Sequence, residues 1–106
     1  MRVFNTMGTH EATYRVATGD TATGLAANKL TSATTGRRMM AATLAVETAN
    51  VRIAIGTDPT QGASGTGILL YPGDVLRVVG IENLADLKYI SAANGVAGAI
   101  QVMPEY

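Results

Sequence analysis

Two apolar runs around a tight turn decide the fold of this chain: residues 68–79 read ILLYPGDVLRVV. Leu, Ile, Val and Tyr suit the pleated, half-buried surface of a β-strand. The Pro-Gly-Asp sequence at 72–74 supplies the backbone angles that a tight reversal needs. The stretch therefore predicts two strands, 68–71 and 75–79, joined by a turn.

The same pattern recurs on both sides of this stretch. Runs of alternating or continuous apolar residues predict further strands, and a single helical turn suits residues 82–86. Asn94-Gly95 is a hairpin signal, so the last two strands are expected to pair with each other. Residues 56–67 form a glycine-rich loop between two strands. The further strands are expected at 11–18, 39–48, 51–55, 88–93 and 96–103.

Residues 39–48 also allow a second interpretation. Ala, Met, Leu and Glu are good helix formers, so a helix competes with the strand here. We prefer the strand because Val51, Ile53 and Ile55 continue the period-2 alternation. Residues 21–38, by contrast, have few apolar anchors and predict a long connection with room for one short strand.

Together these elements predict an all-β protein, a small antiparallel β-sandwich resembling a jelly roll. The expected organisation is an extended N-terminal arm at residues 1–10 and a single sandwich domain at 11–106. The alternation also predicts which side chains form most of the core. They are Leu44, Val46, Val51, Ile53, Ile55, Leu70, Leu76, Val78, Ile90, Ile100 and Val102.

Composition narrows the classes of partner. Eight basic and eight acidic residues give a net charge near zero, so no basic surface is expected to bind nucleic acid or a membrane. There is no cysteine, which excludes disulfides and thiolate zinc sites. Only 15% of residues are charged, against about 25% in an ordinary soluble domain. Either the surface is simply rich in Ala and Thr, or much of it contacts other subunits; the second alternative predicts a homotrimer or homodimer.

The first residues lack the apolar core of a signal peptide, and no run approaches the ~20 apolar residues of a membrane span. We therefore expect the chain to fold in the cytoplasm.

No group of residues predicts catalysis. His10 is the only histidine, and none of its possible serine partners stands in a nucleophile-elbow sequence. Residues 62–67, GASGTG, lack the Gly-Lys-Ser/Thr ending of a phosphate-binding loop. The carboxylates are scattered, and several stand in turns beside Gly or Pro. We expect no enzyme activity, no cofactor and no metal.

As a whole, the order of elements resembles small β-sandwich proteins encoded among the structural genes of tailed bacteriophages. Residues 40–106 carry the resemblance: an apolar strand with Arg52, a Gly/Thr loop, LLYPGD at 69–74, Asn83-Leu84, a Lys-Tyr-Ile strand and a C-terminal Tyr106. The match is one of pattern and includes little of residues 1–38.

The resemblance implies a virion protein, most simply a decoration or cement protein on the exterior of the capsid, with the major capsid protein as partner. A head-to-tail accessory or fibre-base module, or a small non-viral ligand-binding sandwich, is the alternative. The segments expected to contact a partner are the arm and the loops 21–38 and 56–67, since their backbone is least committed to the core. Within or next to them the contact candidates are Arg2, Phe4, His10, Leu25, Arg37, Arg38, Asp58 and Pro59.

Overall fold

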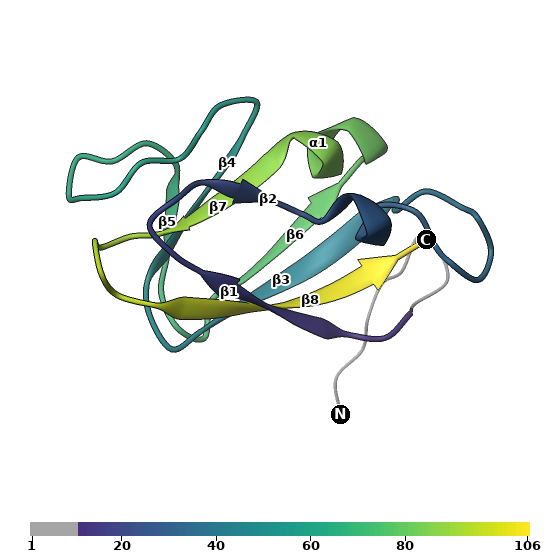
Figure 1. Cartoon of the computed structure of the whole chain (residues 1–106), viewed down its shortest axis with the longest axis horizontal. Helices are drawn as coiled ribbons and strands as arrows, with labels where there is room; N and C mark the ends of the chain where they lie inside the picture. Colours follow the sequence, from purple (N-terminus) through teal and green to yellow (C-terminus); the bar gives the residue numbers. More distant parts are fainter. Residues whose placement is uncertain (1–10) are drawn as a thin grey trace.

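The computed structural model describes residues 11–106 and consists mainly of β-strands (Figure 1). The predicted arm at residues 1–10 lies outside the described residues. The strands are β1 (Tyr14–Thr18), β2 (Thr23–Gly24), β3 (Ala41–Glu47), β4 (Val51–Ile55), β5 (Ile68–Leu70), β6 (Val75–Val79), β7 (Leu87–Ser91) and β8 (Gly98–Glu105). A 3-10 turn, η1 (Ala27–Lys29), and one short helix, α1 (Ile81–Asp86), complete the order.

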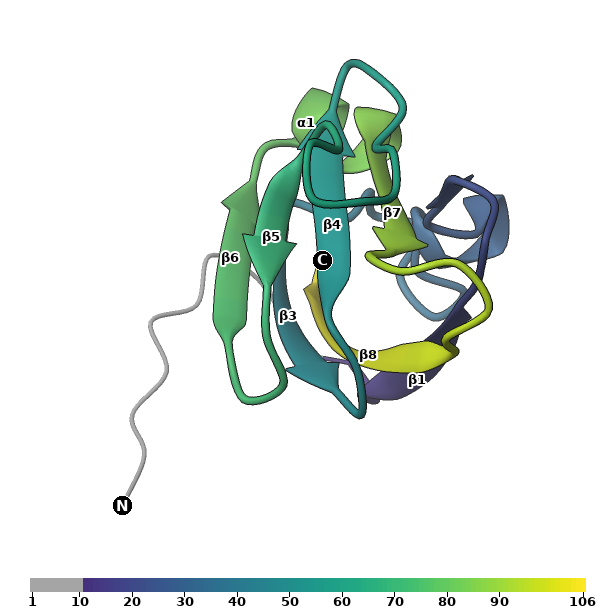
Figure 2. The same cartoon turned by 90° about the vertical axis from the view of Figure 1, so that its left-hand side faces the viewer.

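The strands form two four-stranded antiparallel sheets packed face to face (Figure 2). Sheet I has the order β1-β8-β3-β6, and sheet II has the order β2-β7-β4-β5. The prediction of a small all-β sandwich is confirmed at this level, and residues 39–48 contain a strand rather than the competing helix.

The predicted hairpin on Asn94-Gly95 is wrong. β7 and β8 lie in different sheets, so the connection at 92–97 crosses from one sheet to the other. The two amino acids encode the reversal, and Gly95 does have a positive φ of 75°. They do not determine which strand β8 pairs with, because β8 pairs on one side with β1 and on the other with β3.

The Pro-Gly-Asp turn at 72–74 has the same role. Its geometry matches the prediction, with Gly73 at φ 96° and the Asp74 N–H donating to the Tyr71 carbonyl at 2.9 Å. The Asp74 carboxylate accepts from the Tyr71 N–H at 2.8 Å. Because β5 belongs to sheet II and β6 to sheet I, this turn joins the edge strands of the two sheets.

The core prediction is largely confirmed. The predicted residues that are buried are Leu44, Val46, Val51, Ile53, Leu70, Val78, Ile90, Ile100 and Val102. Leu76 is partly buried and packs against the core cluster. Ile55 was predicted wrongly, since it is 45% exposed: it ends β4, where the chain leaves the sheet at Gly56.

Ile90 is buried outside the main core cluster. It lies opposite Arg52 in the β4–β7 register, on the face of sheet II that residues 56–67 cover. Its neighbour Tyr89 points into the core instead, together with Leu87 and Leu84, which the period-2 pattern did not single out.

Candidate interaction surfaces

Exposed apolar side chains gather on one edge of the sandwich. Most of the large exposed apolar residues of the described chain come from β5, β6 and the segments next to them. They are Ile68 at 58%, Tyr71 at 53%, Val75 at 59%, Val79 at 40% and Ile81 at 37% exposed. We call these five residues the β5–β6 edge; strands β6 and β5 lie at the left of Figure 2. Grouped apolar exposure of this kind is typical of interaction sites.

Strand alternation and edge position explain why these residues are exposed. In β6, Leu76 and Val78 point toward the core, so Val75 and Val79 point to the outer face of sheet I. Ile68 lies opposite Ile53 but has no neighbouring strand beyond it within residues 11–106.

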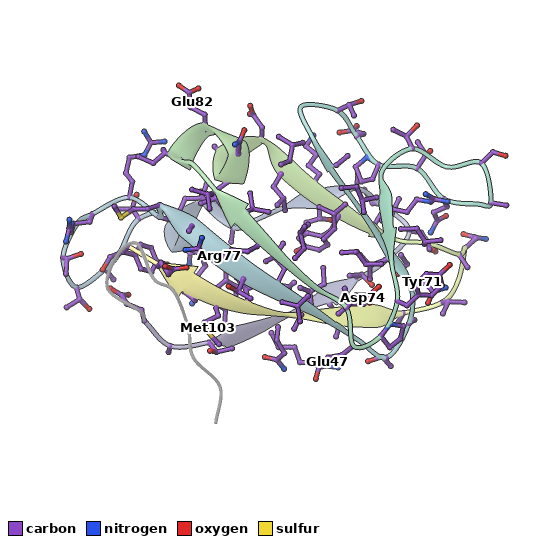
Figure 3. All side chains as sticks on the ribbon, turned by 180° about the vertical axis from the view of Figure 1, so that it is seen from behind. Glu47, Tyr71, Asp74, Arg77, Glu82 and Met103 are labelled. Carbon is purple, nitrogen blue, oxygen red and sulfur yellow. The ribbon has the colours of Figure 1, made fainter. Side chains whose placement is uncertain are left out.

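One charged pair lies between the two valines. The Arg77 guanidinium, in the middle of β6, contacts both carboxylate oxygens of Glu105 at 3.1 Å (Arg77 is labelled in Figure 3). The Glu105 side chain is 1% exposed and that of Arg77 is 35% exposed. The charge of Arg77 is therefore compensated within its own chain, and the edge is close to neutral.

The loop at residues 56–67 is fastened to sheet II. Arg52, which is 7% exposed, donates from Nη1 to the Gly67 carbonyl at 2.9 Å and from Nη2 to the Gly62 carbonyl at 3.0 Å. A Cβ on Gly65 would lie 2.8 Å from Arg52 Nε, so the loop backbone covers this side chain. Our expectation of an uncommitted loop backbone is thus corrected, because a buried guanidinium binds its carbonyls.

Asp20 fastens the same loop to a second segment. Its carboxylate accepts from the Gln61 side-chain amide and from the Gly95 N–H, both at 2.9 Å. The hydrogen bond from Gln61, which has the larger effect, and the one from Gly95 lower the pKa of Asp20 below its usual value. The Gly62 N–H also donates to the Ala92 carbonyl at 2.9 Å, so the loop and the 92–97 connection form one hydrogen-bonded unit.

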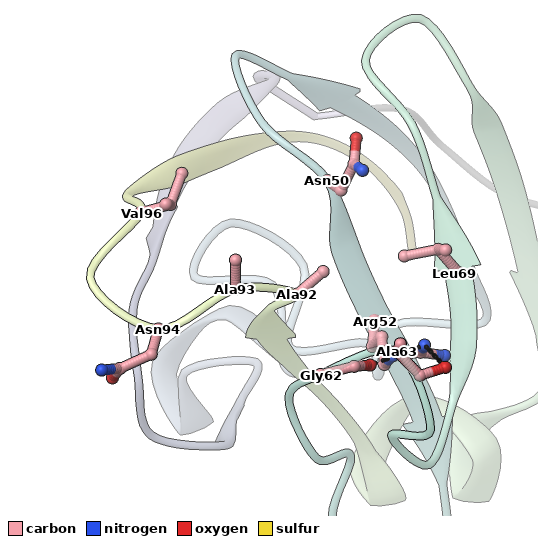
Figure 4. A pocket seen from close by; sticks show the side chains of 9 residues that line it. All are labelled: Asn50, Arg52, Gly62, Ala63, Leu69, Ala92, Ala93, Asn94 and Val96. Atoms are coloured by element: carbon pink, nitrogen blue, oxygen red, sulfur yellow. Dashed lines mark hydrogen bonds between the residues drawn. The ribbon is translucent and has the colours of Figure 1, made fainter.

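A groove of about 600 Å³ lies beside this unit (Figure 4). Its residues are Asn50, Arg52, Gly62, Ala63, Leu69, Ala92, Ala93, Asn94 and Val96. Most of these side chains are small. The one charged side chain, Arg52, directs both of its Nη atoms at the loop carbonyls, while its buried Nε faces Gly65 and has no hydrogen-bond partner in the described residues.

The predicted contact residues fall into three groups. Arg2, Phe4 and His10 lie outside the described residues. Leu25 and Pro59 are buried, so the structure corrects their assignment: both pack within the chain and do not face a partner. Leu25 belongs to the core cluster, and the Pro59 side chain packs near Gly67.

The remaining candidates are exposed. Arg37 and Arg38 lie in a small turn closed by the Thr31–Arg38 bridge. Asp58 forms an exposed ion pair with Lys88 at 2.7 Å. The structure does not bring these residues together, since Asp58 belongs to the fastened loop and the arginines to the 21–38 connection.

Sequence reasoning missed the β5–β6 edge. The pattern of residues 68–79 predicts two strands but does not show whether these strands lie inside a sheet or at its edge. A signal was present: β6 contains four apolar residues and one charge, and lacks the lysines and prolines that often protect edge strands.

The titratable side chains of the described residues are dispersed over the structure. Residues 11–106 contain no group of three or more His, Asp or Glu side chains that could hold a metal ion. Burial, with smaller effects from Tyr106 and Tyr89, raises the pKa of Tyr14 to about 12, which keeps this phenol neutral. No helix in this part of the chain has the length and hydropathy to cross a membrane.

Comparison with known proteins adds no relative. No family model, curated protein or solved structure matches this chain.

Proposed function

We propose that this chain is a bacteriophage virion structural protein, most simply a decoration or cement protein that binds the exterior of the head and stabilises the shell without chemistry. The observation that carries the proposal is the β5–β6 edge, which exposes five large apolar side chains on a chain with only 15% charged residues. A cement protein needs contact surface rather than a reactive group, because it acts by adding buried area between capsid subunits.

The order of the strands supports the structural part of this proposal. We infer that the eight strands form a jelly roll, since consecutive strands alternate between sheets except at the β4–β5 hairpin. Jelly rolls of eight strands in two sheets occur in viral capsid domains. A shared fold does not determine a function, so the strand order supports the proposal by analogy with capsid proteins.

The proposed partners are the major capsid protein and further copies of the same chain. We assign the β5–β6 edge to these contacts, with Arg37 and Arg38 as secondary candidates because both are exposed. The arm at residues 1–10 stays a predicted contact, and its role is open to a deletion test.

The direct test uses phage shells assembled from a purified major capsid protein. Purified chain is mixed with the shells, the shells are sedimented, and bound copies are counted per capsid subunit. We expect hundreds of copies per particle, and shells with the chain should resist heat and low salt better than shells without it. No sedimentation with shells, or unchanged shell stability, would contradict the proposal.

Variants localise the contact. Val75→Lys places a charge on the β5–β6 edge and should reduce binding to shells at least tenfold. Val96→Lys alters a similarly exposed apolar residue, 46% exposed, beside the fastened loop and serves as the matched control. Deletion of residues 1–10 tests the arm in the same assay, and circular dichroism of each variant shows whether the sandwich remains folded.

The runner-up is a head-to-tail accessory or fibre-base module. Copy number separates it from a cement protein, because about a dozen or fewer copies per particle indicate a vertex or tail position. For a non-viral ligand-binding sandwich, the groove in Figure 4 is the corresponding site. The commitment of Arg52 to loop carbonyls makes this alternative weaker.

A further inference from the structure

We propose that two copies of this chain pair through their β6 strands, antiparallel about a twofold axis at Arg77, so that sheet I continues from one copy into the other. The inference deepens the proposed function, on which it rests for its setting, by naming a second copy as the occupant of the β6 edge.

Backbone hydrogen bonds of β3 show which of its residues face β6. The Val46 N–H donates to the Asp74 carbonyl, and the Val46 carbonyl accepts from the Gly73 N–H, both at 2.9 Å. Val46 therefore directs its backbone groups toward β6. Because backbone groups alternate sides along a strand, every second residue of β3 before Val46 does the same.

The β3–β6 register shows which residues of β6 face β3. The β3 residues in question, Leu44 and Ala42, lie opposite Leu76 and Val78. These two residues of β6 thus direct their N–H and C=O groups toward β3. The other residues of β6 direct theirs away from β3, toward an edge with no partner strand within residues 11–106. They are Val75, Arg77 and Val79.

A twofold axis at Arg77 uses all three of these residues. The Val79 carbonyl also accepts from the Asn83 side-chain amide at 3.0 Å, which leaves its second lone pair for the ladder. It places Val75 opposite Val79 of the second copy and Arg77 opposite its own counterpart. Each outward-directed residue then meets another outward-directed residue, which an antiparallel ladder requires. Moving the axis by one residue keeps this match but shortens the ladder, so Arg77 is the position with most hydrogen bonds.

The side chains are compatible with this pairing. The sequence VLRVV is apolar on both sides of its centre, so valine meets valine on the outer face, and Leu76 meets Val78 on the inner face. Pairs of β-branched residues across strands are favourable. Leu76, partly exposed in one copy, gains cover from the second copy.

The charge of Arg77 does not oppose the twofold pairing of the β6 strands. Two arginines directly opposite each other normally destabilise a strand pair. Here the Arg77 guanidinium contacts both oxygens of the Glu105 carboxylate in its own chain, so each copy brings a compensated pair to the axis.

The expected strength follows from the size of the contact. A five-residue edge with its neighbouring side chains belongs to the small class of interfaces, below about 1,200 Å². We expect a dissociation constant between about 1 μM and 1 mM in solution. On a shell, simultaneous contacts of both copies with the surface raise the effective concentration and favour the dimer.

A cross-linking experiment tests the register. The chain has no cysteine, so Val75→Cys and Val79→Cys each introduce a single thiol into the full chain. In the proposed pairing, positions 75 and 79 of two copies have Cα atoms about 5.5 Å apart, within disulfide range. Two copies of position 75 lie about 13 Å apart, which is too far.

We expect a mixture of the two variants to form the mixed disulfide dimer at least tenfold faster than either variant forms its own dimer. A mixture that cross-links no faster than the single variants overturns the proposed register.

Sedimentation equilibrium tests the association itself, up to a concentration on the order of 1 mM. The unmodified chain and Val96→Lys should form dimers, whereas Val75→Lys should remain monomeric with an unchanged thermal unfolding temperature. A monomeric unmodified chain at all concentrations overturns the inference, even where the chain binds shells. Dimers without shell binding sustain the inference and contradict the proposed function, so the two failures are distinguishable.

Discussion

Two neighbouring regions of the sandwich differ in how their polar and apolar groups are paired. The loop at residues 56–67 has its carbonyls bound by Arg52 and is tied to the 92–97 connection through Asp20. The β5–β6 edge, which begins directly after this loop at Ile68, leaves large apolar side chains exposed. A segment without secondary structure is thus committed to the fold, while regular strands carry the exposed apolar surface that we propose for a partner. Variants in the two regions are therefore expected to behave differently.

The largest expected effect is at the fastened loop. Arg52→Met keeps the apolar stem but removes the donors to Gly62 and Gly67. We expect a loss of about 3 kcal/mol in the free energy of unfolding, since charged donors are lost from a buried position. Urea unfolding measures it. Arg15→Met is the matched control, because Arg15 is 59% exposed and its removal should change stability by about 0.5 kcal/mol or less. Equal losses would contradict the fastening role of Arg52.

Leu76→Ala comes next and probes the boundary between core and edge. Leu76 is partly buried against the core cluster, so its truncation should cost about 2 kcal/mol, the low end for leucine. Val75→Ala, one residue away on the exposed face, should cost about 0.5 kcal/mol or less in the monomer. A cost for Val75→Ala equal to that of Leu76→Ala would mean that the outer face of β6 is covered in the monomer.

Gly65→Ala should destabilise the loop by about 1–2 kcal/mol. A Cβ there would lie 2.2 Å from the Thr60 carbonyl oxygen, so the loop must shift and strain its contact with Arg52. Gly19→Ala is the control, because nothing lies within 4 Å of its Cβ position. Thermal unfolding of the two variants gives the comparison, and equal unfolding temperatures would contradict close packing in the loop.

The smallest expected effect concerns alkaline pH. The pKa of Tyr14 is raised to about 12 from its ordinary value of 10.0, so the folded chain keeps a proton that the unfolded chain releases. This contribution is fully present below pH 10 and is lost as pH rises from about 10 to 12. Tyr14→Phe should decline in stability less steeply over this range, measured by urea unfolding. The remaining decline reflects Tyr89 and Tyr106, whose pKa values burial also raises. An identical decline would contradict burial of the phenol.

The sequence predicted strands and buried residues better than the pairing of those strands. Alternation located most strands and buried residues, because each inward position of a strand is decided by its own hydrophobicity. It failed at Asn94-Gly95, where a correct turn was given the wrong strand pairing, since pairing depends on residues far apart in the sequence. It also failed for Ile55, whose exposure depends on where the strand ends.

The candidate surface was predicted less well for the same reason. Glycine and proline content marked residues 56–67 as a loop, but the pattern could not show that Arg52 would be buried beneath it. In the same way, LLYPGDVLRVV predicts two strands without showing that both are edges. Only the strand order of both sheets reveals which backbone groups have no partner strand in residues 11–106.

The most direct test of the central claim is amide hydrogen exchange along β6, measured by NMR at low and high protein concentration. The Leu76 and Val78 amides, which point toward β3, should be protected at both concentrations. The amides of Val75, Arg77 and Val79 should exchange rapidly at low concentration and become protected at high concentration as a second copy pairs with the edge. Protection of these three amides that does not change with concentration would contradict the account.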